Sequence, residues 1–227
     1  MNITNEDNMK LMSRYEDNHF DLAIVDPPYG YGDKKTDILN FRQKEQHREW
    51  NIAPSDEYFK ELFRVSKNQI IWGGNYFPFI WGFGGRCFIY WHKGNPVPNF
   101  ADGELAWTSF DKNAKQIDYR YYGNLEGNTS ASKKLHPTQK PVKLYEWLLM
   151  NYAQKKCSHK HRESERHLCT DCKNSNVKIL DTHLGSGSIA IACHNLGFDL
   201  TACELDKEYY DAAMKRLHEH QLQTKLF

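Results

Sequence analysis

The chain has 227 residues and a formal net charge of +1, a size that favours one domain with a buried core. A chain this close to neutral does not coat nucleic acid unselectively, so any DNA binding must come from local patches. One such patch combines Tyr119, Tyr121 and Tyr122 with Arg120, a mixture suited to stacking on bases. The polar N-terminus and the lack of a long apolar run argue against a signal peptide and a transmembrane helix. We therefore expect an intracellular, cytoplasmic protein without a membrane partner.

Short apolar runs alternate with segments of helical spacing along the chain. Strands are predicted at 21–26 (DLAIVD), 69–73 (QIIWG), 87–92 (CFIYWH), 177–182 (VKILDT) and 199–204 (DLTACE), and helices near 55–66, 142–154, 188–196 and 206–219. This alternation predicts an α/β fold with a mostly parallel sheet, covered by helices on both faces, that binds ligands beyond the carboxyl ends of its strands. Residues 30–54 and 94–135 lack clear periodicity and are predicted to be long functional loops.

The first predicted strand ends in Asp26, Pro27, Pro28 and Tyr29, followed by Gly30. Two successive prolines cannot donate hydrogen bonds to a sheet, and they hold their backbone nearly fixed. One interpretation is an ordinary Pro-Gly turn. The other is a rigid polar corner that presents an acid and an aromatic ring at the end of a strand. The pentapeptide is compatible with both.

A strand, a glycine turn, a helix and a second strand ending in an acid follow one another from Val177 to Glu204. Gly185 and Gly187 let the backbone approach a ligand closely, and the helix that follows offers free N–H groups. Glu204 is placed to accept hydrogen bonds from two ribose hydroxyls. The pattern predicts a nucleotide site. Because G-S-G-S-I-A also fits the loose dinucleotide fingerprint, an NAD-dependent oxidoreductase is a second interpretation.

The order of the motifs separates these interpretations. D-P-P-Y at 26–29 and HPTQKPV at 136–142 both precede DTHLGSGS at 181–188, and CELDKEYYDAAMKRL follows from Cys203. In these segments the chain resembles the beta group of S-adenosylmethionine-dependent amino methyltransferases that act on DNA, of the phage and restriction-modification type. IIWGGNYF at 70–77 and FADGELAWTSF at 100–110 resemble the same family. Nearly the whole chain except residues 155–176 takes part in the resemblance.

The resemblance implies a Rossmann-like class I methyltransferase with a circularly permuted motif order, in a single domain over residues 1–227. Its activity would be methyl transfer from S-adenosylmethionine to the exocyclic amino group of a base in DNA. Adenine N6 is favoured, because within the family an aspartate at the start of D-P-P-Y accompanies mostly adenine. Cytosine N4 methylation and a nucleic-acid-binding protein without activity are the alternatives. Residues 94–135 form the candidate target-recognition region, and a homodimer is compatible with the resemblance.

The same resemblance assigns catalytic roles to the four residues of the corner. The Asp26 carboxylate and the Pro27 carbonyl would accept hydrogen bonds from the target amine and direct its lone pair at the methyl donor. Pro28 would keep the turn rigid, and Tyr29 would stack on the base. Since an amino group inside a duplex is out of reach, the base must first be flipped out.

The cofactor-binding residues are assigned in the same way. They are Asp7, His136, Thr138, Lys140, Asp181, Gly185, Gly187, Ser188 and Glu204. Glu204 would hold the ribose and Asp7 the adenine amino group, while Asp181 and the glycine turn would hold the methionine moiety. His136, Thr138 and Lys140 would close over the methionine end. An ordinary helix N-cap is the competing interpretation of Asp7, and Trp72 and Trp107 are expected in the core.

Residues 155–176 form a Cys- and His-rich insertion that the family lacks. Its potential zinc ligands are Cys157, His159, His161, His167, Cys169 and Cys172. The close pair Cys169 and Cys172 resembles half of a structural zinc site. We predict a structural zinc ion held by Cys157, His161, Cys169 and Cys172. The alternative is a basic loop with incidental cysteines, because the spacing fits no standard zinc finger.

Overall fold

A computed structural model describes residues 1–30, 52–94, 101–122, 125–126, 129–130, 139–153 and 176–223. The strands are β1 (Asn2–Asn5), β2 (Leu22–Val25), β3 (Gln69–Trp72), β4 (Phe88–His92), β5 (Gly103–Thr108), β6 (Lys115–Asp118), β7 (Tyr121–Tyr122), β8 (Leu125–Glu126), β9 (Thr129–Ser130), β10 (Lys178–Asp181) and β11 (Asp199–Glu204). The helices are α1 (Asn8–Met12), α3 (Asp56–Val65), the 3-10 turn η1 (Gly74–Tyr76), α4 (Pro78–Trp81), α5 (Val142–Tyr152), α7 (Ser188–Leu196) and α8 (Lys207–Gln223).

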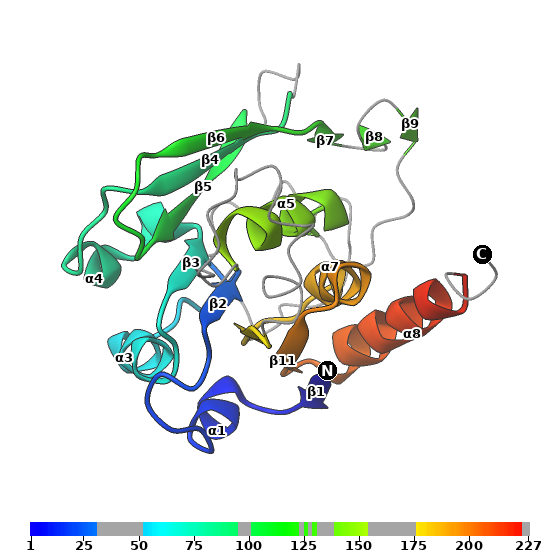
Figure 1. Cartoon of the computed structure of the whole chain (residues 1–227), viewed down its shortest axis with the longest axis horizontal. Coiled ribbons are helices and arrows are strands. Elements are labelled where there is room, and N and C mark those ends of the chain that lie inside the picture. The colour runs from blue at the N-terminus through cyan, green and yellow to red at the C-terminus, as the bar shows by residue number, and fades with distance from the viewer. Residues whose placement is uncertain are drawn as a thin grey trace.

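Eight strands form one sheet in the order β1-β11-β10-β2-β3-β5-β4-β6 (Figure 1). The first five strands in this order are parallel to one another. β5 runs antiparallel to both of its neighbours, β3 and β4, and β6 is parallel to β4. The expected mostly parallel α/β sheet is confirmed, and each strand and helix predicted from periodicity is present, with ends at most four residues from the predicted ones.

The expectation of a loop throughout residues 94–135 was wrong, because β5 and β6 belong to the main sheet. β6 is mostly exposed and polar, as an edge strand that is held by the backbone hydrogen bonds of its ladder. β5 carries an acid and a glycine before its buried end at Ala106, Trp107 and Thr108. Neither strand shows the alternation of apolar residues that reveals a strand in a sequence.

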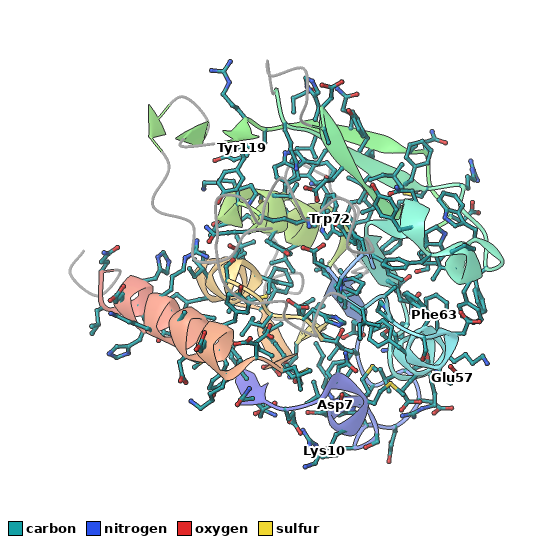
Figure 2. All side chains as sticks on the ribbon, turned by 180° about the vertical axis from the view of Figure 1, so that it is seen from behind. Asp7, Lys10, Glu57, Phe63, Trp72 and Tyr119 are labelled. Carbon is teal, nitrogen blue, oxygen red and sulfur yellow. The ribbon has the colours of Figure 1, made fainter. Side chains whose placement is uncertain are left out.

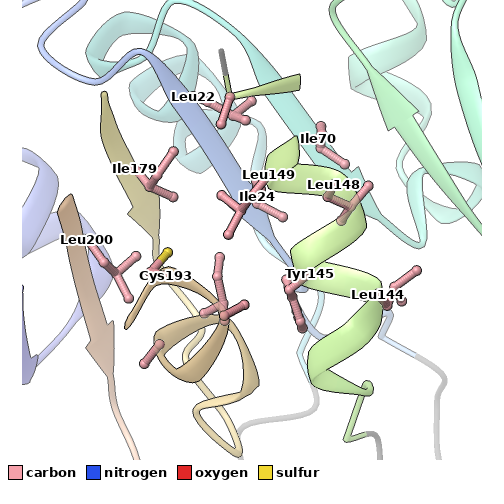
Figure 3. Close-up of a cluster of buried hydrophobic side chains, with 14 of the residues drawn as sticks. Leu22, Ile24, Ile70, Leu144, Tyr145, Leu148, Leu149, Ile179, Cys193 and Leu200 are labelled. Atoms are coloured by element: carbon pink, nitrogen blue, oxygen red, sulfur yellow. The ribbon is translucent and has the colours of Figure 1, made fainter. Parts of the chain in front are cut away.

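Helices cover both faces of the sheet. α5, α7 and α8 lie on one face, and their apolar side chains pack against one side of the central strands (Figure 3). α1, α3 and α4 cover the other face. Successive side chains of a strand point to opposite faces, so in β2 Leu22 and Ile24 join the first cluster while Ala23 and Val25 join the second. The sheet is therefore the wall between two hydrophobic cores.

Two expectations about aromatic residues have different outcomes. Trp72 and Trp107 are fully buried, as expected, and Trp72 lies inside the molecule in Figure 2. Tyr121 was expected to be available for stacking on bases, which was wrong, because it is 3% exposed and its ring packs 6.3 Å from that of Trp91. In the described parts of the chain, no helix is long and apolar enough to cross a bilayer.

Candidate active site

Three acids meet at one edge of the sheet. Asp26 follows β2, Asp181 ends β10 and Glu204 ends β11. β10 is the parallel neighbour of both β2 and β11, so the carboxyl ends of these strands lie side by side. The sequence separates Asp26 from Asp181 by more than half of the chain, and the parallel sheet brings them together. This edge is where an open α/β sheet binds its ligands.

Asp26 is held at the corner by two donors. The Tyr29 hydroxyl donates a hydrogen bond of 2.9 Å to Oδ1 of Asp26, and the Lys140 ammonium forms an ion pair with Oδ2. The side chain of Asp26 is 15% exposed and that of Lys140 only 2%. Of the two interpretations of D-P-P-Y, the rigid polar corner is therefore the one that the structure supports.

The Tyr29 ring depends on a glycine that the sequence does not single out. Gly73, directly after β3, has φ +65°, and a Cβ atom there would lie 2.1 Å from Cε1 of Tyr29. Tyr76 stacks on the Tyr29 ring with centroids 5.1 Å apart. Since only glycine adopts this backbone conformation readily and also leaves space for the ring, Gly73 sets the position of Tyr29.

Lys140 links Asp26 to a second acid. Its Nζ lies 3.0 Å from Oε2 of Glu104, at the start of β5, and Oε1 of Glu104 pairs with Lys93, which follows β4. The ring centroid of Trp72 lies 5.2 Å from the Lys140 ammonium, a cation–π contact. The four side chains form a row of alternating charge, Asp26, Lys140, Glu104 and Lys93. Two carboxylates are balanced by two ammonium groups in a largely buried place.

Burial and charge act differently on the two carboxyls of this row. Burial raises the pKa of Asp26, which Lys140 opposes and the nearby Glu104 reinforces. Burial also disfavours the charged form of Glu104, but Lys140 and Lys93 together outweigh it and lower the pKa of Glu104 to about 2. Burial acts against the charge of Lys140 as well, yet its two carboxylate partners raise its pKa overall. The low pKa keeps Glu104 charged near pH 7, where it pairs with Lys140.

Glu104 and Lys93 were missed by sequence reasoning, although FADGELAWTSF was noted as a segment. A signal was present, because Glu104 is an acid inside a stretch that supplies a strand with a buried half. A charged residue in such a strand needs a partner of opposite charge. The partner, Lys140, is 36 positions away, so the sequence alone could not identify the pair. The predicted role of Lys140 at the methionine end stays untested, and its contacts here are with Asp26, Tyr29 and Glu104.

Glu204 is fixed by the backbone of the glycine turn. Its Oε2 accepts a 2.8 Å hydrogen bond from the N–H of Gly185, and its Oε1 accepts one of 3.0 Å from Asp206. Each carboxylate oxygen has a further lone pair for a ligand hydroxyl. Gly185 has φ +53°, and the nearest atom to a Cβ built there would be the His183 carbonyl oxygen at 3.9 Å. The turn thus leaves room on the side where a Gly185 side chain would point.

Asp181 lies between the two halves of the site. It is 2% exposed, and its Oδ1 accepts a 3.0 Å hydrogen bond from the N–H of His183. Burial raises the pKa of Asp181 to about 8; the His183 N–H opposes this, and the charge of Asp26 adds to it. Because β2 and β10 are parallel neighbours, the corner that carries Asp26 and the turn that follows Asp181 lie at the same edge of the sheet.

A buried chain of hydrogen bonds supports the glycine turn. The Tyr58 hydroxyl of α3 lies 2.6 Å from Oγ1 of Thr182, which lies 3.0 Å from Nδ1 of His183. Nε2 of His183 lies 3.1 Å from the Asn8 amide of α1. Burial lowers the pKa of His183 to about 4, so the ring is neutral near pH 7. This chain ties α1 and α3 to the turn that carries Asp181.

Gly187 and Ser188 face α8. A Cβ atom on Gly187, which has φ +74°, would lie 3.1 Å from Cβ of Ala213. The Ser188 hydroxyl is 2.9 Å from Nη1 of Arg216 and 3.2 Å from that of Ser186. Both residues therefore have a packing role between α7 and α8, and their predicted contact with a cofactor stays untested.

Asp7 is the N-cap of α1. Its Oδ1 accepts a 3.0 Å hydrogen bond from the N–H of Lys10, as the competing interpretation expected (Figure 2). It also lies just beyond β1, whose last residue, Asn5, pairs with Glu204. Asp7 is exposed, so its second carboxylate oxygen is available to a ligand at this edge.

Several predicted site residues lie outside the described ranges. These are His136 and Thr138 and the zinc set of Cys157, His161, Cys169 and Cys172. Within the described ranges, no group of three or more His, Cys, Asp or Glu side chains is placed to hold a metal ion. The zinc site therefore stays a prediction from sequence.

The chain was compared with known families and proteins. The N6/N4 methyltransferase family, described as DNA methylase, matches residues 71–215. The type II methyltransferase M.HpaI of Haemophilus parainfluenzae is 25% identical over 251 residues, which cover 92% of this chain and 71% of that protein. The type II methyltransferase M2.DpnII of Streptococcus pneumoniae is 23% identical over 261 residues, with coverage of 96% and 89%.

Two solved structures share the fold. The M1.HpyAVI complex with S-adenosylmethionine superposes with a TM-score of 0.57 and 23% identity, over 95% of this chain and 98% of that one. The PvuII DNA methyltransferase, which is cytosine-N4-specific, superposes with a TM-score of 0.53 and 11% identity, over 96% and 90%.

Proposed function

Since this chain belongs to the N6/N4 DNA methylase family, and is a S-adenosylmethionine-dependent methyltransferase of base amino groups in DNA, we propose that its target is N6 of adenine. The support is Asp26, because an aspartate at this place accompanies mostly adenine in the family that the sequence resembles. Cytosine N4 remains the alternative, since the fold of the cytosine-N4-specific PvuII enzyme is similar. The NAD-dependent interpretation was wrong, because the matching family is one of DNA methylases.

We also assign the chain to the beta group with a circularly permuted motif order. The support is the order along the chain, in which the Asp26 corner precedes the glycine turn at Gly185. In the sheet the two motifs end neighbouring strands, β2 and β10, so the active site is the same whichever motif comes first. The permutation therefore concerns the chain and leaves the chemistry unchanged.

The edge of the sheet fits S-adenosylmethionine by its chemistry. This cofactor presents hydrogen-bond donors at three points, the methionine ammonium, the ribose hydroxyls and the adenine amino group. We assign one acceptor to each donor: Asp181 to the methionine ammonium, Glu204 to the ribose hydroxyls and Asp7 to the adenine amino group. The open side of Gly185 lets the backbone approach the ligand. When bound, the cofactor supplies an electrophilic methyl group on a sulfonium sulfur.

The corner supplies the other half of the reaction. A flipped adenine would stack on Tyr29 and place its N6 amino group at the Asp26 carboxylate and the Pro27 carbonyl. Hydrogen bonds to these acceptors oppose delocalisation of the nitrogen lone pair into the ring and aim it at the methyl group. As the N–C bond forms, the bond between the methyl group and the sulfonium sulfur would break and S-adenosylhomocysteine would leave. The amine becomes positively charged, and the fixed negative charge of Asp26 stabilises it. One N–H proton would then pass to solvent water and give the neutral N6-methyl product.

The observation that carries this assignment is the Asp26 carboxylate, fixed by Tyr29 and Lys140 beside the cofactor edge. Asp26→Asn keeps the shape and removes the charge, and we expect a loss of methyl transfer of at least about 100-fold, as for other preorganised electrostatic groups. Labelled S-adenosylmethionine and unmethylated bacterial DNA give the assay. Asp111→Asn, which removes a charge from an exposed ion pair with Arg86, is the control. Wild-type turnover of Asp26→Asn would remove this residue from the mechanism.

The target base itself is tested by sequencing the methylated DNA for modified positions. N6-methyladenine supports the proposal, and N4-methylcytosine contradicts it while leaving the role of Asp26 intact. The same data give the recognition sequence, which the candidate recognition region at 94–135 does not disclose. The homodimer, the cytoplasmic location and the structural zinc remain predictions.

A further inference from the structure

We propose that Glu104 is a positioning residue for methyl transfer, which takes over the ammonium group of Lys140 so that Asp26 can receive the target amine. This inference rests on the proposed role of Asp26. Glu104 lies on β5, 78 positions from Asp26 in the sequence. Among the ion pairs of the described residues, Lys140 is the one side chain that pairs with both acids.

Both oxygens of Asp26 are engaged in the structure. Tyr29 donates to Oδ1 and Lys140 pairs with Oδ2. Each of these oxygens keeps a second lone pair, but an incoming amino group that donates to Asp26 must share an oxygen with Tyr29 or with Lys140. Of the two, Lys140 is the greater obstacle to the target amine, because its positive charge also opposes the positive charge that develops on the amine.

Lys140 cannot leave Asp26 for solvent, because its side chain is 2% exposed and an unpaired buried ammonium is costly. Glu104 removes this obstacle. Its Oε2 already lies 3.0 Å from the Lys140 ammonium, so Lys140 can move toward Glu104 and keep a carboxylate partner throughout. The face of Trp72, 5.2 Å away, remains beneath the ammonium as a third support.

The strand order explains why Glu104 can do this. β5 is antiparallel to β3, so the start of β5 lies at the edge where β2 and β3 end. β4 is antiparallel to β5 in turn, which brings Lys93, directly after β4, to the same edge, opposite the start of β5. Lys93 pairs with Oε1 of Glu104, while Oε2 faces Lys140 and, at 3.4 Å, the Tyr29 hydroxyl. The antiparallel insertion of β5 thus delivers the second carboxylate to the corner.

The test uses Glu104→Gln, Lys140→Met and the double variant. With a neutral Gln at 104, Lys140 has Asp26 as its sole charged partner and should stay on it. We expect kcat to fall by about 10- to 100-fold, the size of one charge roughly 6–12 Å from the reacting atoms at an effective dielectric constant of about 20. The KM for S-adenosylmethionine should change little, because Glu104 lies on the base side of Asp26. Removing Lys140 as well frees Asp26, so the double variant should be at least about tenfold faster than Glu104→Gln.

Glu146→Gln is the matched control, because Glu146 is also a largely buried carboxylate that pairs with a lysine, Lys143, on α5. It should leave kcat unchanged. A structural role of Glu104 would give a different pattern, in which the double variant is no faster than the slower single variant; that result, or wild-type kcat in Glu104→Gln, overturns the inference.

Folding of each variant is checked by circular dichroism and by calorimetric binding of S-adenosylmethionine. If Glu104→Gln does not fold, Glu104→Asp replaces it, since it keeps the charge but withdraws it by one methylene from Lys140; an unchanged kcat there also overturns the inference. Asp26→Asn distinguishes failure of the proposed mechanism from failure of the role of Glu104. If that variant is active, the proposed mechanism fails; if it is inactive while Glu104→Gln turns over normally, only the role of Glu104 fails.

Discussion

Replacement of Gly73 by alanine should damage the active site through the ring of Tyr29. The new Cβ would lie 2.1 Å from Cε1, 2.5 Å from Cδ1 and 2.6 Å from Cζ of that ring. These distances are far below van der Waals contact, so either the ring or the turn must move. Because the Tyr29 hydroxyl holds Oδ1 of Asp26, the displacement should also release the Asp26 carboxylate.

The expected magnitude has two parts. A non-glycine residue at φ +65° costs about 1 kcal/mol in backbone strain. Loss of the hydrogen bond from Tyr29 to a charged acceptor adds about 1.5–3 kcal/mol. Gly73→Ala should therefore lower the free energy of unfolding by about 3 kcal/mol. A misplaced base platform should lower kcat by about 100-fold as well.

Gly197→Ala provides the matched control. Gly197 ends α7 with φ +74°, and no atom lies within 4 Å of a Cβ built there. This variant has the backbone strain without the collision, so the difference between the two variants measures the effect on Tyr29. Urea unfolding gives the two stabilities, and transfer of labelled methyl groups to DNA gives the two rates. Equal stabilities together with wild-type turnover of Gly73→Ala would refute the reasoning.

Three further predictions concern the cofactor edge and the insertion. Glu204→Ala should weaken S-adenosylmethionine binding about 10- to 100-fold in calorimetry, which is the contribution of a hydrogen bond to a charged group. Neither the wild type nor this variant should bind NADH. An unchanged affinity for S-adenosylmethionine would contradict the assignment of Glu204 to the cofactor ribose. Since the folded chain holds the Asp181 proton up to about pH 8 and the unfolded chain releases it near pH 4, this carboxyl makes stability fall as pH rises between those values. Asp181→Asn should flatten that fall in urea unfolding at pH 5 and pH 8, and an unchanged slope would argue against it. Elemental analysis should find about one zinc ion per chain, lost when Cys169 and Cys172 are both changed to Ser; metal-free wild-type protein would show that the cysteines are incidental.

The sequence by itself determined the class of fold and pointed to Asp26 and Glu204, which lie in the two halves of the proposed active site. The central residues of DLAIVD and VKILDT are apolar because a parallel sheet is buried on both faces. A short, continuous apolar run in the sequence therefore indicates such a strand. Asp26 stood out because it follows such a strand and precedes two prolines, and Glu204 because it ends the strand that comes after the glycine turn and its helix. These features are local, so a sequence displays them.

Only the tertiary structure decided what stabilises Asp26. Glu104, Lys93 and Lys140 are spread over β5, the end of β4 and the start of α5, and they meet because β5 enters the sheet antiparallel between β3 and β4. β5 and β6 have no clear periodicity, and no local pattern records that β5 pairs with β3. The partner of a buried charge is set by which strands are neighbours, and that depends on the packing of the whole chain.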